Sequence, residues 1–320
     1  MQSMRGLRPT IRAGALALWT HNLKNIDVLD YERPYYFGKA LRFSAGIQLS
    51  EAYQAAHDQG LVVMGGTRPT VGLAGGYTQG TGHGLSVSKL RFSANQALEW
   101  EVVTVDGDIL VATPEENIDL FWALSGGGGG TYGIVLSLTI KAYPDQRTAA
   151  ANLTWTNEDI SQETYYAMIQ RYIAALPKLL DAGGTSIWLN SNDFFQMSPA
   201  VAMAYYSADF PTYLVNPVFR DASASLVVGT SDQAQNLASK ELMTETLVPI
   251  LSELIPGVGY AYLNEGDPWE PNWQQVFYGD SYWRLLEIKE KFDPDRVLYG
   301  RTSVGSEAWT EAPDGRLCQS

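Results

Sequence analysis

Cysteine is almost absent from this 320-residue chain, and histidine is scarce. The single cysteine, Cys318, excludes an internal disulfide and any metal site built from several thiolates. The three histidines, His21, His57 and His83, lie too far apart in the sequence to indicate a zinc site. The sequence therefore predicts no metal site and no stabilisation by disulfides.

Positive charge and long apolar runs are also lacking. The chain has 22 Lys and Arg residues and 35 Asp and Glu residues, which gives a net charge of -13. The basic residues form no cluster in the sequence. Most of the surface would repel a polyanion, so no nucleic-acid partner is expected. No apolar window approaches the length of a membrane span, so no membrane association is expected. The basic N-terminus has no apolar segment behind it, which predicts a cytoplasmic protein as written, or a secreted one if an upstream segment is missing.

Glycine is abundant and concentrated in two stretches, residues 65–84 and residues 126–130. The second stretch is five consecutive glycines between the apolar segments 121–124 and 134–138. Glycine lets the backbone approach a ligand closely and adopt positive φ, as in loops that bind phosphates. A tight chain reversal without a ligand explains the same run. The glycines alone leave both interpretations open.

The periodicity of apolar residues predicts an α+β fold for a chain that is 45% hydrophobic. The expected strands are residues 14–18, 39–47, 62–64, 186–189 and 201–206, together with a hairpin over 98–113 that turns at Asp106-Gly107. The expected helices are residues 50–59, 158–182, 232–255 and 281–292, and one that begins at the capping box Thr113-Pro114-Glu115-Glu116 and places Ile118, Phe121 and Trp122 on one face. A change in composition after Pro144 predicts a domain boundary near residue 145.

Several motifs, in this order, resemble the berberine bridge enzyme-like flavin-linked oxidases, within the wider vanillyl-alcohol oxidase fold. The motifs are Pro69-Thr70-Val71-Gly72-Leu73-Ala74-Gly75-Gly76, residues 98–104 with Asp106-Gly107, residues 120–124 leading into the glycine run, residues 278–282, and Ile288-Lys289-Glu290-Lys291-Phe292-Asp293-Pro294. The resemblance is specific in the middle and the tail of the chain and looser over residues 145–260.

The resemblance implies a partial PCMH-type FAD-binding domain over residues 1–145 that lacks most of its N-terminal subdomain. A shortened substrate domain, an antiparallel sheet with flanking helices, would follow over 146–275, and the segment 276–320 would return to the flavin site. The implied activity is hydride transfer from a small molecule, such as an alcohol, a sugar or a secondary metabolite, to FAD, with oxygen as the acceptor. The implied FAD-binding residues are Pro69, Thr70, Val71, Gly72, Gly75, Gly76, Gly80, Gly82, His83, Gly126, Gly127, Gly128, Gly129, Gly130, Tyr132, Gly133, Ile134 and Val135.

The chain departs from the family pattern in three places. The loop whose histidine tethers the flavin in relatives is missing, and Arg68 occupies the position of the second tether, a cysteine. We therefore expect FAD to be bound non-covalently, with Arg68 exposed. Residues 202–213 join two stretches that a longer segment separates in relatives, which predicts a shortened substrate sheet.

Three residues are candidates for the chemistry. His83 matches a histidine in the flavin-proximal loop of the family, and Tyr282 matches the second tyrosine of a Tyr-Gly-x-Asn-Tyr motif whose asparagine is Ser281 here. Tyr262 is a second tyrosine that could accept a proton as hydride leaves. Two interpretations remain: an FAD-linked oxidoreductase, or a non-catalytic truncated paralogue that keeps part of the fold without a working flavin site.

Overall fold

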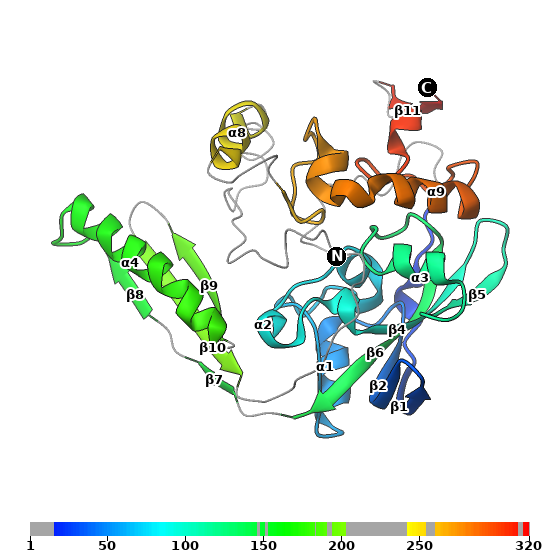
Figure 1. Cartoon of the computed structure of the whole chain (residues 1–320), viewed down its shortest axis with the longest axis horizontal. Helices are drawn as coiled ribbons and strands as arrows, with labels where there is room; N and C mark the ends of the chain where they lie inside the picture. Colours follow the sequence, from blue (N-terminus) through cyan, green and yellow to red (C-terminus); the bar gives the residue numbers. More distant parts are fainter. Residues whose placement is uncertain are drawn as a thin grey trace.

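The computed structural model describes residues 16–145, 148–150, 153–182, 184–190, 194–202, 242–253, 260–312 and 316–319. It confirms the α+β class, because helices accompany two larger sheets and a small C-terminal one (Figure 1). Every pairing among the described strands is antiparallel. Among the described helices, none combines the length and the hydropathy that crossing a bilayer would require.

The first sheet forms the centre of the N-terminal half. Its strands are β1 (Ile26–Arg33), β2 (Tyr36–Ser44), β3 (Leu61–Val63), β4 (Ala97–Val103), β5 (Ile109–Ala112) and β6 (Ile134–Pro144). They are ordered β1-β2-β6-β4-β5, and β3 pairs with β6. Trp100 on β4 lies opposite Leu138 on β6, and both side chains are fully buried. Along β4, buried residues alternate with less buried ones. The alternation fixes the register of β4, because a shift by one position would turn Trp100 out of the core.

Short helices accompany this sheet, and three of them pack against its buried side chains. They are η1 (Thr20–Asn22), α1 (Leu49–His57), the π-helix η2 (Leu73–Tyr77), α2 (Val87–Leu90), η3 (Ser93–Gln96) and α3 (Ile118–Leu124). α1 buries Leu49, Ala52 and Ala56, which share one helical face, and a capping box between Gln48 and Glu51 begins it. The predicted helix 50–59 and the 98–113 hairpin are thus confirmed.

Three local predictions were wrong. Residues 16–18 form no strand, and the first strand is instead β1, a polar strand at the edge of the sheet, whereas the predicted strand 39–47 is confirmed as β2. Thr113 caps a turn, accepting hydrogen bonds from the backbone N–H groups of residues 115 and 116, and the helix begins only at Ile118. Ile118 is 55% exposed, so it does not share the buried face of the helix.

The second sheet contains β7 (Thr148–Ala150), β8 (Leu153–Thr156), β9 (Gly184–Asn190) and β10 (Phe194–Ala202), with α4 (Gln162–Asp181) packed on one face. In Figure 1 this lobe stands beside the first sheet. Tyr165 and Ile169 of α4 and Phe195 of β10 are its buried centre. The predicted helix 158–182 and the strand 186–189 are confirmed, whereas residues 203–241, which include much of the predicted deletion site, lie outside the described residues. The domain limits at 145 and 275 stay predictions.

The C-terminal part crosses back over the first sheet. Its elements are η4 (Met243–Leu247), α8 (Val248–Ser252), η5 (Gln274–Tyr278), η6 (Gly279–Ser281), α9 (Tyr282–Phe292), η7 (Ser306–Ala308), β11 (Trp309–Glu311) and β12 (Leu317–Gln319). The predicted helix 281–292 is confirmed as α9, which lies beside α3 (Figure 1). Arg284 of α9 stacks over the ring of Trp122 at 4.0 Å and contacts Asp119 at 3.3 Å. The end of the chain is therefore attached to the helix that precedes the glycine run.

A buried ion pair completes this attachment. Lys289 of α9 and Asp293 are 1% and 0% exposed and contact each other directly. The Lys289 ammonium also donates to the carbonyl oxygens of Thr131, at 2.7 Å, and Leu298, at 2.8 Å. Burial lowers the pKa of Lys289, and the Asp293 carboxylate opposes that shift. One cation thus ties α9 to the residue that follows the five glycines.

Replacing Lys289 by Met should destabilise the protein by about 3–5 kcal/mol, because it leaves the Asp293 carboxylate buried without its cation. Denaturant unfolding measures this loss. The matched control is Lys291→Met on the same helix, where the side chain is exposed and the expected change is within about 0.5 kcal/mol. Equal midpoints for the two variants would contradict the assignment of Lys289 as a structural cation.

Candidate functional site

The two glycine-rich stretches contact each other directly. The backbone N–H of Gly128 donates to the carbonyl of Gln79 at 2.8 Å. A Cβ added to Gly129 would lie 2.7 Å from the Cα of Gly76, a distance that real side chains do not adopt. Part of the glycine content is therefore required for packing of one loop on the other, as the chain-reversal interpretation proposed.

Other glycines leave the backbone open. A Cβ added to Gly75 or Gly130 would meet no heavy atom within 4 Å, and one added to Gly72 would meet only a carbonyl oxygen at 4.0 Å. Gly128 and Gly130 have φ values of +102° and +70°, which favour glycine. Backbone that is open on one side and fixed on the other can receive a ligand at close range.

Two buried polar atoms beside these loops have no hydrogen-bond partner in the described structure. They are Oε1 of Gln79 and Oγ1 of Thr131, in residues that are 3% and 0% exposed. The Thr131 hydroxyl lies 3.5 Å from the position of a Cβ on Gly128. An unpaired buried polar group costs about 1–3 kcal/mol, so both atoms fit a partner that is not part of the chain. The sequence interpretation missed both residues, although each is a polar residue within or beside a glycine stretch.

The remaining predicted cofactor residues lie in different environments. Pro69 and Thr70 are exposed, while Tyr132 and Val135 belong to the main hydrophobic core. A Cβ on Gly133 would lie 2.6 Å from the Val102 side chain, so close packing explains this glycine. Their roles in binding FAD stay predictions. The exposure expected for Arg68 is confirmed.

His83 and Tyr262, two of the candidates for the chemistry, lie side by side. Their ring centroids are 5.1 Å apart in an edge-to-face arrangement. Asn264 donates through Nδ2 to the Tyr262 hydroxyl at 2.6 Å and to the carbonyl of Gly76 at 2.9 Å. Glu265, which the sequence interpretation did not select, places Oε1 at 3.1 Å from Nε2 of His83. These contacts connect the first glycine stretch to the C-terminal part of the chain.

Burial controls the protonation of the phenols in this region. It raises the pKa of Tyr262 well above its usual value, and the hydrogen bond from Asn264 opposes this shift only in part. Burial likewise raises the pKa of Tyr77, whose hydroxyl donates to the carbonyl of His83 at 3.0 Å. Both phenols therefore remain protonated at neutral pH and can donate hydrogen bonds.

Tyr282, the third candidate, has different contacts from those of the His83–Tyr262 pair. It is 2% exposed, packs against Trp273 and Tyr278, and donates to Oε1 of Glu307 at 2.6 Å. Burial and this hydrogen bond raise its pKa. Tyr278 connects it to the glycine run, since its hydroxyl lies 3.4 Å from a Cβ placed on Gly128. The contacts of Tyr282 give it a packing role, and its catalytic role stays a prediction.

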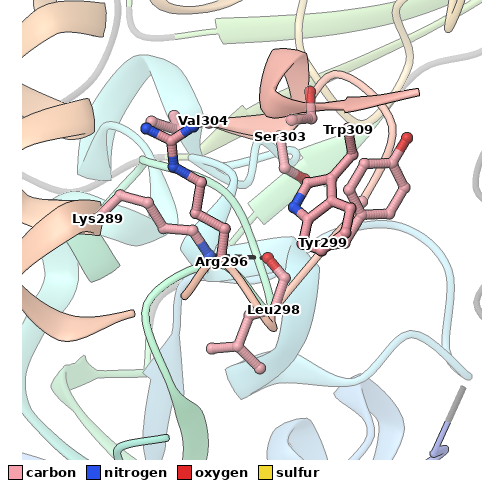
Figure 2. Close-up of a pocket in the computed structure, with 10 residues that line it drawn as sticks. Lys289, Arg296, Leu298, Tyr299, Ser303, Val304 and Trp309 are labelled. Carbon is pink, nitrogen blue, oxygen red and sulfur yellow. Dashed lines mark hydrogen bonds between the residues drawn. The ribbon is translucent and has the colours of Figure 1, made fainter. Parts of the chain in front are cut away.

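A small pocket lies between α9 and the segment that follows it, residues 296–309. Figure 2 shows Lys289, Arg296, Leu298, Tyr299, Ser303, Val304 and Trp309 around it. Its two cations are already engaged, because Lys289 contacts Asp293 and two carbonyl groups, and Arg296 donates to Glu290 at 2.9 Å. The pocket belongs to the attachment of the C-terminal segment. Across the described ranges, no group of three His, Cys, Asp or Glu residues could hold a metal ion.

Comparison with known proteins identifies the family. A family model for berberine and berberine-like proteins matches residues 261–305, the segment that supplies Tyr262, Asn264 and Glu265. The chain is 35% identical to the FAD-linked oxidoreductase sor8 of Hypocrea jecorina, covering 96% of this chain and 70% of that protein. It is 34% identical to the VAO-type flavoprotein oxidase VAO615 of Thermothelomyces thermophilus, covering 96% and 71%.

The structural comparison agrees. The crystal structure of the VAO-type flavoprotein MtVAO615 from Myceliophthora thermophila superimposes with a TM-score of 0.87 at 30% identity, covering 96% of this chain and 74% of that one. The alignment with sor8 extends over 401 positions, more than the 320 residues of this chain, so the relative carries segments without a counterpart here. The shared sequence, fold and order of motifs lead to one conclusion: the chain belongs to the berberine bridge enzyme-like, VAO-type FAD-linked oxidoreductases.

Proposed function

We propose that this protein is an oxidase that takes hydride from a carbon bearing a hydroxyl group in a small secondary metabolite and passes the electrons to oxygen. The observation that carries the proposal is the junction of the two glycine loops, where open backbone and unpaired polar atoms lie next to a pair of ionisable side chains. The similarity to VAO615, a flavoprotein oxidase, supports oxygen as the acceptor. No similarity favours the non-catalytic alternative.

The residues at the junction fit FAD. Open backbone at Gly75 and Gly130 suits close approach by an anionic diphosphate, which backbone N–H groups bind well. Gln79 Oε1 accepts, and Thr131 Oγ1 both donates and accepts, so a polyhydroxylated chain offers each a partner. When bound, FAD supplies the hydride acceptor, and the protein supplies orientation.

The side chains of Tyr262, Asn264 and His83 are placed to orient the substrate and to exchange a proton with it. The protonated hydroxyl of Tyr262, fixed by Asn264, is placed to donate a hydrogen bond to a substrate oxygen. Asn264 also holds Gly76, so the same side chain orients the loop and the phenol. His83, whose side chain is 44% exposed, is the neighbouring group that can take a proton.

Non-covalent attachment of FAD is part of the proposal. Arg68 is exposed where relatives carry a cysteine, and Cys318 is an exposed residue of β12 in the small C-terminal sheet. His21 stacks on Trp19 with ring centroids 5.5 Å apart, and His57 lies in the last turn of α1. Neither side chain belongs to the glycine loops.

The purified protein should show flavin absorbance after incubation with FAD, and an oxidisable alcohol should bleach it without air. Readmitting air should restore the absorbance and produce hydrogen peroxide. Absence of flavin absorbance after incubation with excess FAD would refute the proposed function.

Acid precipitation of the FAD-loaded protein should release all of the flavin into the supernatant, because an exposed arginine, Arg68, stands where relatives carry the tethering cysteine. Absorbance of the supernatant and of the redissolved pellet measures the partition. Flavin that stays with the denatured protein would contradict non-covalent binding.

Gly75→Leu should weaken FAD binding at least about tenfold, equivalent to about 1.4 kcal/mol, because the new side chain enters the open space beside the loop. Flavin fluorescence titration measures the dissociation constant. The control Ser50→Leu places the same side chain on the exposed surface of α1 and should leave binding unchanged. Gly129→Ala should instead lower the thermal midpoint, since its Cβ collides with Gly76. Wild-type affinity in Gly75→Leu would place FAD elsewhere.

A further inference from the structure

The imidazole of His83 lies between two side chains of one turn. The turn runs from Tyr262 to Glu265 and is closed by a hydrogen bond from the backbone N–H of Glu265 to the carbonyl of Tyr262 at 2.8 Å. The Tyr262 ring contacts the imidazole edge-to-face, and the Glu265 carboxylate contacts its Nε2 at 3.1 Å. The turn thus constrains both the plane of the ring and one of its nitrogens.

The turn is itself fixed to the protein. Leu263 is 7% exposed and belongs to the main core, and Asn264 donates to Gly76. The neighbouring Gly266 has no room for a side chain, because an added Cβ would lie 2.4 Å from the Phe277 ring. These contacts hold Glu265 in place while its carboxylate remains 37% exposed.

The loop that carries His83 is held from the other side. Tyr77 donates to the His83 carbonyl, and Ser93 donates its backbone N–H to the carbonyl of Gly82 at 2.8 Å. Thr81 has a φ of +97°, which is strained for a β-branched residue. Strain of this kind persists where the surrounding structure enforces it, often at functional sites.

We propose that Glu265 is a positioning residue that orients His83 and makes it the proton acceptor for the substrate hydroxyl. A carboxylate accepts only, so Nε2 of His83 carries the proton that faces Glu265. The other ring nitrogen, Nδ1, then keeps its lone pair. Neither ring nitrogen of His83 has another hydrogen-bond partner among the described residues.

The proton transfer completes the oxidation proposed above, on which this inference rests. The substrate O–H bond breaks and its proton moves to Nδ1 of His83, while the electron pair of that bond forms the new C=O bond. The C–H bond breaks, and FAD, when bound, would accept its hydrogen together with both electrons of that bond. The imidazolium that results is stabilised by the Glu265 carboxylate, as in other carboxylate–histidine pairs.

The neighbouring ionisable groups do not compete for this role. Besides Glu265, the described titratable side chains that contact His83 are Tyr262, at its ring, and Tyr77, at its backbone carbonyl, and both phenols remain protonated. Tyr53 lies behind Tyr77 and is likewise protonated, because burial raises its pKa. Histidine is the side-chain type that ordinarily exchanges a proton near neutral pH.

The first test needs no substrate. Diethyl pyrocarbonate acylates imidazole, and peptide mass spectrometry separates His83 from His21 and His57, which serve as internal references. In Glu265→Gln, acylation of His83 should slow several-fold, because the amide does not increase the nucleophilicity of the ring. The two reference histidines should react as in the wild type. An unchanged rate at His83 would overturn the pairing.

The second test measures flavin reduction in the FAD-loaded protein, without air, by the fastest-reacting member of a panel of benzylic and aliphatic alcohols and sugars. Glu265→Gln should lower the maximal rate at least about tenfold, with little change in half-saturation, because only the transition state needs the oriented base. Glu265→Asp should recover part of the rate. The control Glu287→Gln removes an exposed carboxylate from α9 and should react normally.

The outcomes separate the two proposals. If FAD binds but no member of the panel reduces it, the proposed function fails together with this inference. If the panel reduces FAD equally fast in the wild type and Glu265→Gln, the proposed function stands and the role of Glu265 is refuted. A slower Glu265→Gln without recovery in Glu265→Asp would also refute the role of Glu265, because a second carboxylate should still orient the ring.

Discussion

The buried ammonium of Lys289 is the interaction on which the arrangement of the C-terminal part depends. A cation with 1% exposure is stable only where its partners replace water, and here a carboxylate and two carbonyl groups do so. One of those carbonyls belongs to Thr131, directly after the glycine run. The backbone N–H groups of Val297 and Leu298 donate to Asp293, so the carboxylate also shapes the chain beyond α9. This network explains the lysine and aspartate of the Ile288–Pro294 motif as structural residues.

Glycine has two separate roles around this attachment. At Gly84 and Gly129 it allows backbone to pass backbone, since a Cβ at these positions would lie 1.9 Å from the Gly65 oxygen and 2.7 Å from the Gly76 Cα. At Gly75 and Gly130 nothing in the described structure occupies the space of a side chain. The glycine run therefore does not have to be either a chain reversal or a ligand-binding loop. Some of its glycines allow close packing of backbone on backbone, and others leave space for a ligand.

The spacing of apolar residues in the sequence predicted those helices and strands in which the buried residues recur at the period of the element. The β4–β5 hairpin, α1 and α9 were predicted because their apolar residues repeat at the spacing of the element. The strand β1 was missed because Asp27, Asp30 and Glu32 interrupt any alternation on an edge strand. The π-helix η2 was missed because a glycine-rich sequence carries no helical signal. Of the candidate site, His83 was selected from a family motif and Tyr262 as a further tyrosine, whereas Glu265 was not selected. Its contact with His83 spans 182 positions, and such a separation leaves no local pattern.

The candidate site is a junction of three chain segments. Residues 72–84 supply His83 and one side of the glycine contact, residues 126–131 supply the other side, and residues 262–265 supply the turn that holds the imidazole. Asn264 and Lys289, together with Glu265, are polar side chains that attach the C-terminal part to the first two segments. The unpaired atoms of Gln79 and Thr131 lie where these segments meet, so a ligand that satisfied them would bind only the assembled junction. The free energy by which such a ligand stabilises the folded protein rises with the logarithm of the ratio of the ligand concentration to the dissociation constant. If FAD is that ligand, as proposed above, its binding and the attachment of the C-terminal segment are coupled, and each favours the geometry that the other requires.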